Sequence, residues 1–401
     1  FMVKREKYLS QIRDFYDKDI IKIITGIRRS GKSVLLKQII DELLQLGIDS
    51  NHIIYINFED VKYANITNFM DLNNYVTSYM QDDNKYYLFF DEIQQVDKWE
   101  KTIVSLKSTR NTSIFITGSN SKLLSGELAT LLSGRYVSFR IAPFSFKEIV
   151  ELKNLQTKEE IKQEFLEYIL WGGMPQRFEF PNEESMKTFL KDIFNSIVLK
   201  DIVKRYNIKN VTIFERIMEY LVTNPSQVFS IKNMLAEFEK ENIPISTKTV
   251  YECLDYAEVS MLMIKASEYD IRGKRILSRK DKYYLTDLGL GQILNTNKKA
   301  QYGAYLENIV FNELLYRGYE VSIGNNNGKE IDFVATKYNQ KEYYQVCYYL
   351  NDEQVVEREF GAYSDINDNY PKYVISMDEL DFSQNGIIHK NIIDWLLTKQ
   401  Q

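Results

Sequence analysis

The first 142 residues combine two patterns of apolar positions. Short, continuous apolar runs are typical of strands that are buried on both faces of a sheet, and the stretches between them have apolar residues at helical spacing. The runs that predict strands are 20–25, 52–58, 86–90, 113–117 and 136–141. Because strands and helices alternate, we predict an α/β core in residues 1–142, with a parallel sheet flanked by helices.

Helical periodicity dominates the next part of the chain. It continues through residues 143–209, which we predict to be a helical lid or subdomain, and it is broken at 171–175 by a tight turn. Residues 210–300 then contain two short helices and two strand-like runs, 261–266 and 282–285. Two helices followed by a β-ribbon are typical of a winged-helix module.

One motif in the core has a specific chemistry. Residues 26–33 fit the phosphate-binding pattern G-x-x-x-x-G-K-[ST], and they lie between a predicted strand and a predicted helix. In this motif, backbone N–H groups and the helix N-terminus hold the phosphates of ATP, Lys32 reaches the β- and γ-phosphates, and Ser33 ligates Mg²⁺. The residues expected to bind ATP here are Gly26, Arg28, Arg29, Ser30, Gly31, Lys32, Ser33 and Val34.

A pair of carboxylates supplies a second element of a nucleotide site. The apolar run 86–90 ends in Asp91 and Glu92. Open α/β sheets bind ligands at the carboxyl ends of their strands, so we expect Asp91 to hold Mg²⁺ and Glu92 to act as the general base toward water. The alternative is a strand followed by a solvated acidic turn.

Other polar residues end or begin the predicted strands. Asn57 is placed to orient Glu92, and Ser119 and Asn120 are placed to touch the γ-phosphate or the attacking water. Arg135 precedes the last strand and is a candidate to stabilise charge in phosphoryl transfer, within its own chain or across a subunit boundary of a homo-oligomer. For each residue, a role in a turn or at the surface is the alternative.

Composition narrows the class of protein. A length of 401 residues predicts two or three domains, and 44% hydrophobic with 27% charged residues is typical of a globular chain. The chain has no run of eighteen apolar residues and no apolar signal core near its start, so we expect a cytoplasmic protein without a membrane partner. Two cysteines and two histidines exclude a Cys/His zinc cluster and make a disulfide framework improbable.

The predicted winged helix carries a modest positive charge. Residues 196–285 hold 15 Lys and Arg against 12 Asp and Glu, a net charge of +3. Lys248 on the second helix, with Arg272, Lys274 and Arg275 in the turn of the ribbon, is a candidate contact to DNA phosphates. The alternative is a helical lid with a solvated charged hairpin.

We predict that the C-terminal part of the chain, residues 301–401, forms a second α/β domain related to restriction endonucleases. It has 8 Lys and Arg against 16 Asp and Glu, a net charge of −8. A helical Glu307 and a strand Asp332 match a metal-dependent nuclease site, but Gln345 stands where a carboxylate is needed and Cys347 where a lysine is needed. We therefore interpret the site as degenerate and the domain as kept for binding or assembly.

Taken together, these motifs resemble a known family. The pieces that carry the resemblance are 26–33, 90–94, 116–119, 133–135, 172–175, 283–289 and 328–333. The chain resembles prokaryotic AAA-type ATPases (AAA_14-like) that join a P-loop domain to a C-terminal nuclease-like domain of unknown function (DUF4143-like). The resemblance implies ATP binding, hydrolysis with Mg²⁺ and a winged-helix middle region.

Three functions share the predicted nucleotide site. The first is an ATP-driven switch or motor that acts on or near DNA. The second is an ATP-dependent signalling switch that senses a protein or small ligand through its C-terminal half. The third is an ATP-dependent nuclease, which the residues at positions 345 and 347 disfavour.

Overall fold

A computed structural model describes the fold in two compact units. The described residues are 3–124, 134–204, 208, 210–224, 226, 231–294 and 301–398. The first unit comprises Phe1–Ala142 with Val259–Met261, and the second comprises Pro143–Glu258 with Leu262–Gln401. None of the helices in the described part combines the length and the apolar character needed to cross a membrane.

The first unit contains a parallel sheet of five strands in the order β2-β3-β4-β1-β5. The strands are β1 (Ile21–Thr25), β2 (Ile53–Asn57), β3 (Tyr86–Asp91), β4 (Thr112–Gly118) and β5 (Tyr136–Arg140). Every residue of β1, β3 and β4 is buried, which explains their continuous apolar runs. The predicted α/β core with a parallel sheet is confirmed.

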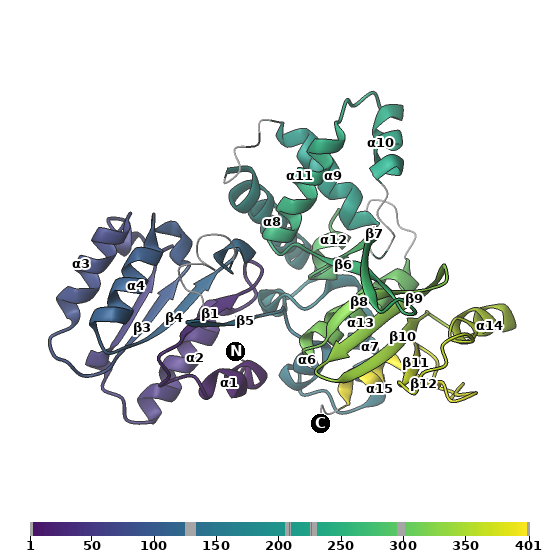
Figure 1. Cartoon of the computed structure of the whole chain (residues 1–401), viewed down its shortest axis with the longest axis horizontal. Helices are drawn as coiled ribbons and strands as arrows, with labels where there is room; N and C mark the ends of the chain where they lie inside the picture. The colour runs from purple at the N-terminus through teal and green to yellow at the C-terminus, as the bar shows by residue number, and fades with distance from the viewer. Residues whose placement is uncertain are drawn as a thin grey trace. The chain divides into compact units, whose positions relative to one another are not determined.

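Helices cover both faces of this sheet (Figure 1). They are α1 (Glu6–Arg13), α2 (Lys32–Gln45), α3 (Phe69–Tyr79) and α4 (Trp99–Thr109). Helices α3 and α4 lie on one face, and α1 and α2 lie on the other. Helix α2 begins at Lys32, within the phosphate-binding motif 26–33, so the positive end of its dipole faces the loop.

The second unit contains a group of helices, all but the last of which precede its sheet in the chain. They are α6 (Phe146–Leu152), α7 (Lys158–Trp171), α8 (Glu183–Ser196), a π-helical segment (Ile197–Lys204), α9 (Val211–Thr223), α10 (Ile231–Lys240), α11 (Thr247–Val259) and α12 (Leu288–Gln292). Capping boxes start α6 and α7, at Ser145 and Thr157. The predicted helix starting near Ser246 is confirmed, since the Ser246 hydroxyl accepts the Thr249 N–H at 3.1 Å.

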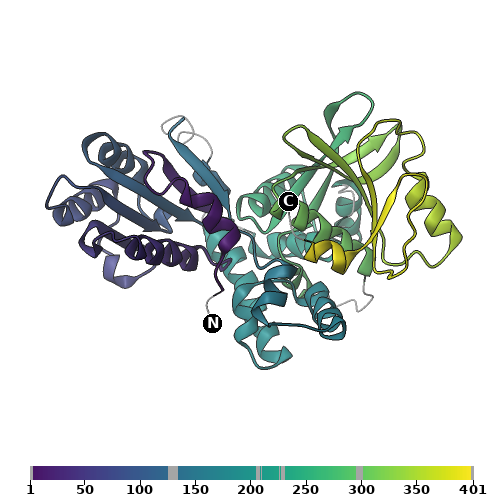
Figure 2. The same cartoon turned by 90° about the horizontal axis from the view of Figure 1, so that it is seen from below.

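A seven-stranded sheet follows, in the order β12-β11-β10-β9-β8-β6-β7. Its strands are β6 (Met263–Asp270), β7 (Arg275–Leu285), β8 (Glu320–Asn326), β9 (Lys329–Lys337), β10 (Gln340–Val346), β11 (Lys372–Ser376) and β12 (Ile388–Asn391). The helices that accompany it are α13 (Tyr302–Tyr316), α14 (Glu353–Gly361) and α15 (Ile392–Leu397). Strand β12, yellow in Figure 2, forms one edge of this sheet, and β7 forms the other.

The hairpin predicted to be a wing is built into this sheet. Strand β6 pairs in parallel with β8, so the hairpin and the C-terminal strands share one set of backbone hydrogen bonds. The expected boundary at residue 300 therefore falls between strands of a single sheet. The sequence did not predict β8, because residues 320–326 contain only two strongly apolar positions and end in polar residues.

In the second unit, Asp287 joins two segments that contain glycines, 172–175 and 287–289. The carboxylate of Asp287 accepts the N–H groups of Gly173 at 2.6 Å and of Gly289 at 3.0 Å. A Cβ atom at Gly173 would lie 2.1 Å from the carbonyl oxygen of Phe144, and one at Gly289 would lie 2.2 Å from that of Trp171. The break at 171–175 is therefore a close backbone junction rather than an ordinary turn.

Gly173→Ala should lower the free energy of unfolding by about 1–3 kcal/mol, because the new methyl group overlaps a backbone carbonyl that cannot yield. Urea unfolding followed by tryptophan fluorescence measures this. Gly303→Ala is the matched control, since no heavy atom of the described residues lies within 4 Å of a Cβ at that helical position. Equal losses in both variants would show that the junction is not tight.

Candidate nucleotide site

The phosphate loop is shaped by two glycines. Gly31 has a φ of +100°, in the left-handed region that favours glycine. A Cβ at Gly26 would lie 2.4 Å from the carbonyl oxygen of Ile141 and 2.7 Å from the Ser30 hydroxyl. The loop therefore packs against the segment that follows β5, and a side chain at Gly26 would displace it.

Two buried hydroxyl groups lie unsatisfied near the carboxyl end of the sheet. Ser30 in the loop and Ser119 after β4 are 0% and 1% exposed, and neither hydroxyl has a hydrogen-bond partner among the described residues. Leaving a buried polar group unpaired costs about 1–3 kcal/mol. A bound polar ligand would offset this cost, so the residues present fit a phosphate group.

The structure brings Lys32 and Glu92 together. The Lys32 ammonium lies 3.3 Å from Glu92 Oε1 and donates to the carbonyl oxygens of Gly26 at 3.1 Å and Ile27 at 3.4 Å. Both side chains are buried, at 4% and 7% exposure. The loop lysine and the acidic residue after β3 thus form one ion pair at the carboxyl edge.

Three neighbours fix the position of Glu92. Its N–H donates to the Thr117 hydroxyl at 2.9 Å, and its carboxylate accepts from the Gln94 amide. Burial alone would raise the pKa of Glu92, but the charge of Lys32 and the hydrogen bonds from Gln94 and Lys32 outweigh it and hold that pKa below its ordinary value. Sequence reasoning did not single out Gln94 or Thr117; their positions beside the two strand ends were the available signal.

Asp91 is held by two hydroxyl groups. Its Oδ1 accepts from Thr117 and its Oδ2 from Tyr55, the latter at 2.9 Å. No group of three or more His, Cys, Asp or Glu side chains in the described part of the chain is arranged to hold a metal ion. A nucleotide-linked Mg²⁺ needs only one or two protein ligands besides phosphate, and Ser33 and Asp91 would suffice.

Among the hydrogen bonds of the described residues, none joins Asn57 to Glu92. Its side-chain oxygen accepts the N–H of Glu59 at 3.0 Å, and Glu59 in turn accepts from Arg28 of the phosphate loop at 2.9 Å. The alternative in which Asn57 shapes a turn therefore describes the structure. Asn120, which is 8% exposed, follows β4 beside Ser119, as expected from the sequence.

Arg135 lies at the amino ends of the parallel strands, whereas the phosphate loop lies at their carboxyl ends. The Arg135 carbonyl accepts the N–H of Ile21, the first residue of β1, whereas the loop follows the last residue of β1. Five strand residues span about 16 Å, so the structure does not bring Arg135 to the phosphate loop of the same chain. Arg140, which is in register with Thr25, lies at the carboxyl ends of the strands, where the loop begins.

A lysine from another strand enters the predicted nuclease-like site. Lys282 on β7 is 4% exposed and pairs with Glu330 and with Glu307, the latter at 3.1 Å. Burial alone would lower the pKa of Lys282, but the carboxylates of Glu307, Asp332 and Glu330 raise it above its ordinary value. The ammonium thus occupies the place among these carboxylates where a divalent cation would have to bind.

The other three positions of this site are Asp332, Gln345 and Cys347. The Gln345 carbonyl accepts the Asp332 N–H at 2.7 Å, and its amide donates to Glu359 at 3.1 Å. Asp332 accepts the Val346 N–H at 2.7 Å, and burial together with the Glu307 carboxylate raises the pKa of Asp332 well above its ordinary value. Cys347 is buried, and burial raises the pKa of its thiol.

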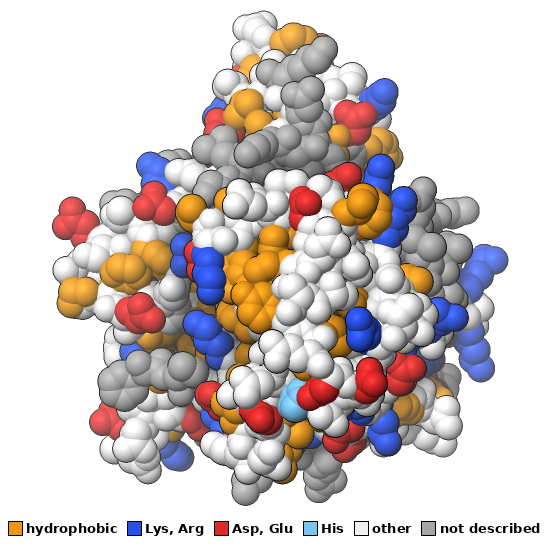
Figure 3. All heavy atoms as spheres, turned by 90° about the vertical axis from the view of Figure 1, so that its left-hand side faces the viewer, with side chains coloured by type: hydrophobic (Ala, Val, Ile, Leu, Met, Phe, Trp, Pro, Cys, Tyr) orange, Lys and Arg blue, Asp and Glu red, His pale blue; other side chains and the backbone are white. Residues whose placement is uncertain are grey.

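The four basic residues proposed for DNA lie on exposed segments of the second unit. Lys248 is 85% exposed at its side chain and lies 3.8 Å from Glu252 on the same helix. Arg272 donates to Asn326 at 3.3 Å, so the β6–β7 turn is attached to the end of β8. Lys274 and Arg275 complete this turn, with Arg275 3.8 Å from Asp270. Figure 3 views the molecule from the left-hand side of Figure 1, and on that face the basic side chains of the described residues are interspersed with acidic and apolar ones.

Comparisons with known proteins bear on both units. Residues 18–150 match the AAA domain family (AAA_14), and residues 162–301 match a domain of unknown function (DUF8612). The AAA part of the resemblance seen in the sequence is confirmed. The rest of the match is to DUF8612, so a likeness to DUF4143 or to nucleases stays a prediction.

Two relatives cover most of the chain. An uncharacterized protein of Haemophilus influenzae is 41% identical over 399 residues, 99% of each chain. An uncharacterized protein of Methanocaldococcus jannaschii is 37% identical over 361 residues, 86% of this chain and 78% of that protein. Among solved structures, a Walker-type ATPase of Pyrococcus abyssi has a TM-score of 0.51 at 15% identity, over 74% of this chain and 96% of that one, which shows a shared fold.

Proposed function

The chain belongs to the same family as the uncharacterized Haemophilus influenzae protein and carries an AAA domain, and we propose that it binds ATP with Mg²⁺ and hydrolyses it. The observation that carries the proposal is the Lys32–Glu92 pair beside the phosphate loop, with an N–O distance of 3.3 Å. A buried basic group for phosphate and a buried carboxylate for water are the two parts that the reaction requires.

Each residue has a distinct part in this proposal. Lys32 exchanges its contact with Glu92 for the phosphates of ATP, which frees the Glu92 carboxylate to accept a proton from water. Thr117 contacts both Asp91 and the Glu92 backbone, and so holds the two acidic residues in fixed relative positions. Mg²⁺, held by Ser33 and Asp91, would neutralise phosphate charge.

The test is phosphate release from ATP by the whole chain, with and without Mg²⁺. We expect release that depends on Mg²⁺ and saturates with ATP. ATP that binds to the chain without any release would restrict the proposal to a binding protein, and the absence of ATP binding would overturn it.

We further propose that nucleotide turnover drives a switch or motor that acts on or near DNA. The support is the exposed Lys248 and the basic turn Arg272–Arg275, which present positive charge to solvent. A gel shift with duplex DNA at two salt concentrations tests this, since binding through phosphates weakens steeply with salt. A shift that is absent at low salt would contradict the DNA role.

A cavity favours the second function, a sensor of a protein or small ligand. It has a volume of about 1250 Å³ and is lined by residues from α14, the segment between α14 and β11, the start of β11 and the loop before β12. Its walls mix apolar residues such as Phe360 and Ile387 with the acidic Glu357 and Asp368. A ligand that raises the melting temperature and alters ATP turnover would support this function over the DNA role.

A role for Arg135 across the subunit boundary of a homo-oligomer stays a prediction. If Arg135 completes a neighbour's site, turnover per chain should rise with protein concentration. Mixing Arg135→Ala with Lys32→Ala protein should then restore part of the activity, because one composite site remains intact. Turnover that is independent of concentration, without complementation, would contradict it.

We expect the C-terminal part to be inert as a nuclease. Purified chain with Mn²⁺ and ATP should leave supercoiled DNA intact, because the Lys282 ammonium already pairs with Glu307 and Glu330. Agarose gels measure cleavage. Cleavage that is lost in Asp332→Ala would contradict the expectation, whereas cleavage that survives this change would come from a contaminant.

A further inference from the structure

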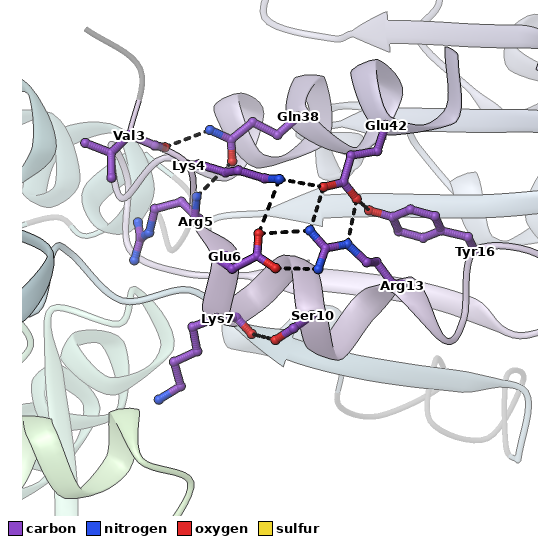
Figure 4. Close-up of polar contacts among 10 residues, drawn as sticks. All are labelled: Val3, Lys4, Arg5, Glu6, Lys7, Ser10, Arg13, Tyr16, Gln38 and Glu42. Atoms are coloured by element: carbon purple, nitrogen blue, oxygen red, sulfur yellow. Dashed lines mark hydrogen bonds and ion pairs between the residues drawn. The ribbon is translucent and has the colours of Figure 1, made fainter. Parts of the chain in front are cut away.

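The segment that precedes β1 is attached to the helix that carries the phosphate loop. Gln38 of α2 donates to the Val3 carbonyl at 2.7 Å and accepts the Arg5 N–H at 3.1 Å. One turn further along α2, Glu42 accepts from Arg13 at 2.9 Å. Figure 4 shows these two sets of contacts side by side along α2.

The Arg5 side chain reaches the loop itself. Figure 4 shows it turned away from the Arg13–Glu42 contacts. Its Nη1 donates to the Ser30 carbonyl at 3.2 Å, and its Nη2 donates to the Ala142 carbonyl at 3.0 Å. The guanidinium also lies 4.8 Å from the ring centre of Tyr8, whose hydroxyl accepts the Ala142 N–H at 3.0 Å. Arg5 is only 2% exposed, so these contacts are shielded from water.

Because the peptide bond is planar, the hydrogen bond from Arg5 to the Ser30 carbonyl also fixes the direction of the Gly31 N–H. The Ser30 C=O and the Gly31 N–H belong to one peptide unit, in which they point in opposite directions. A carbonyl held toward Arg5 therefore directs the Gly31 N–H away from Arg5. The peptide needs such a constraint, because Gly31 has a φ of +100° and glycine has wide conformational freedom.

We propose that Arg5 is a positioning residue for the nucleotide: it fixes the Ser30–Gly31 peptide so that the Gly31 N–H is oriented for the phosphates. This inference rests on the proposed ATPase function and adds a residue outside the loop motif. A guanidinium suits the task, since its planar fork supplies two donors for two carbonyls, whereas an ammonium is a single compact charge. Anion sites at helix N-termini depend on the direction of such N–H groups.

The test compares Arg5→Met and Arg5→Lys with the wild-type chain. Arg5→Met keeps an apolar stem but removes the donors and the charge, so Kd and KM for ATP should rise roughly tenfold, with kcat within about twofold. The Kd for ADP should rise by a similar factor, because the loop is less well ordered for either nucleotide. The Kd and KM of Arg5→Lys should lie between those of the wild type and Arg5→Met, since a lysine can donate to one of the two carbonyls.

Arg13→Met is the matched control, since Arg13 joins the same segment to α2 through Glu42 at the end remote from the loop. It should lower the melting temperature without changing KM. An Arg5→Met chain with wild-type KM and Kd overturns the inference and leaves the ATPase proposal standing. If Arg5→Met does not fold, an Arg5→Lys chain with wild-type KM overturns it equally. A wild-type chain that does not bind ATP overturns the proposed function itself.

Discussion

Replacing Glu92 by glutamine should slow ATP hydrolysis by about 10²- to 10⁴-fold, because an amide cannot accept a proton from water. The structure adds a second expectation. Glu92 pairs with Lys32 at 3.3 Å, so ATP must displace the carboxylate before Lys32 can reach its phosphates. Without that competing charge, Glu92→Gln should bind ATP more tightly than the wild-type chain does.

Single-turnover phosphate release and a fluorescent-nucleotide titration measure these two effects separately. Glu151→Gln, an exposed position on α6, is the matched control and should change neither. Hydrolysis at the wild-type rate would show that Glu92 is not the base. Weaker ATP binding would show that the ion pair with Lys32 does not compete with the nucleotide.

Lys32→Ala should abolish hydrolysis and weaken ATP binding roughly 10- to 100-fold, the range for a hydrogen bond to a charged group. Titration with labelled ATP measures the affinity. The matched control is Lys37→Ala, an exposed position on the same helix, which should bind ATP as the wild type does. Unchanged affinity in the Lys32 variant would contradict the placement of the phosphates.

The same variant should alter how stability depends on pH. In the wild type, the pKa of Glu92 lies below its ordinary value, so its contribution to stability is present near neutral pH and is lost as the pH falls through that pKa. In Lys32→Ala, burial is no longer offset by the lysine and should raise the pKa of Glu92. Stability should then decrease as the pH rises toward neutrality, which urea unfolding between pH 4 and pH 8 would detect.

The sequence predicted the first unit well because its signals are local. Continuous apolar runs mark strands buried on both faces, and the loop motif lies between such a strand and a helix. These local signals do not give strand order, but the alternation of strands and helices did predict parallel strands. In a parallel sheet, a residue that precedes a strand lies at the opposite end from a loop that follows one, so the predicted fold already disfavoured action of Arg135 on its own loop. Arg140, at the other end of the same strand, lies at the same end of the sheet as the loop.

Contacts between distant segments were also beyond sequence reasoning. A lysine does lie beside Glu307 and Glu330, but it stands at position 282 and not at 347, with 64 residues of the printed sequence between the two positions. Periodicity cannot show such a substitution, because β7 and α13 meet only in the folded sheet. Gln94 was not singled out, because its position just after a strand end does not by itself show that its side chain turns back to Glu92.

The pairing of β6 with β8 has a practical consequence for dividing the chain. A fragment that begins at residue 301 contains β8 but lacks β6, the strand that pairs with it. Strand β8 would then be an edge strand with unpaired backbone groups, a surface that promotes aggregation. The same cut would remove Lys282 and leave the carboxylates of Glu307 and Glu330 to repel each other. A soluble C-terminal fragment should therefore start before Met263, so that it carries its own hairpin.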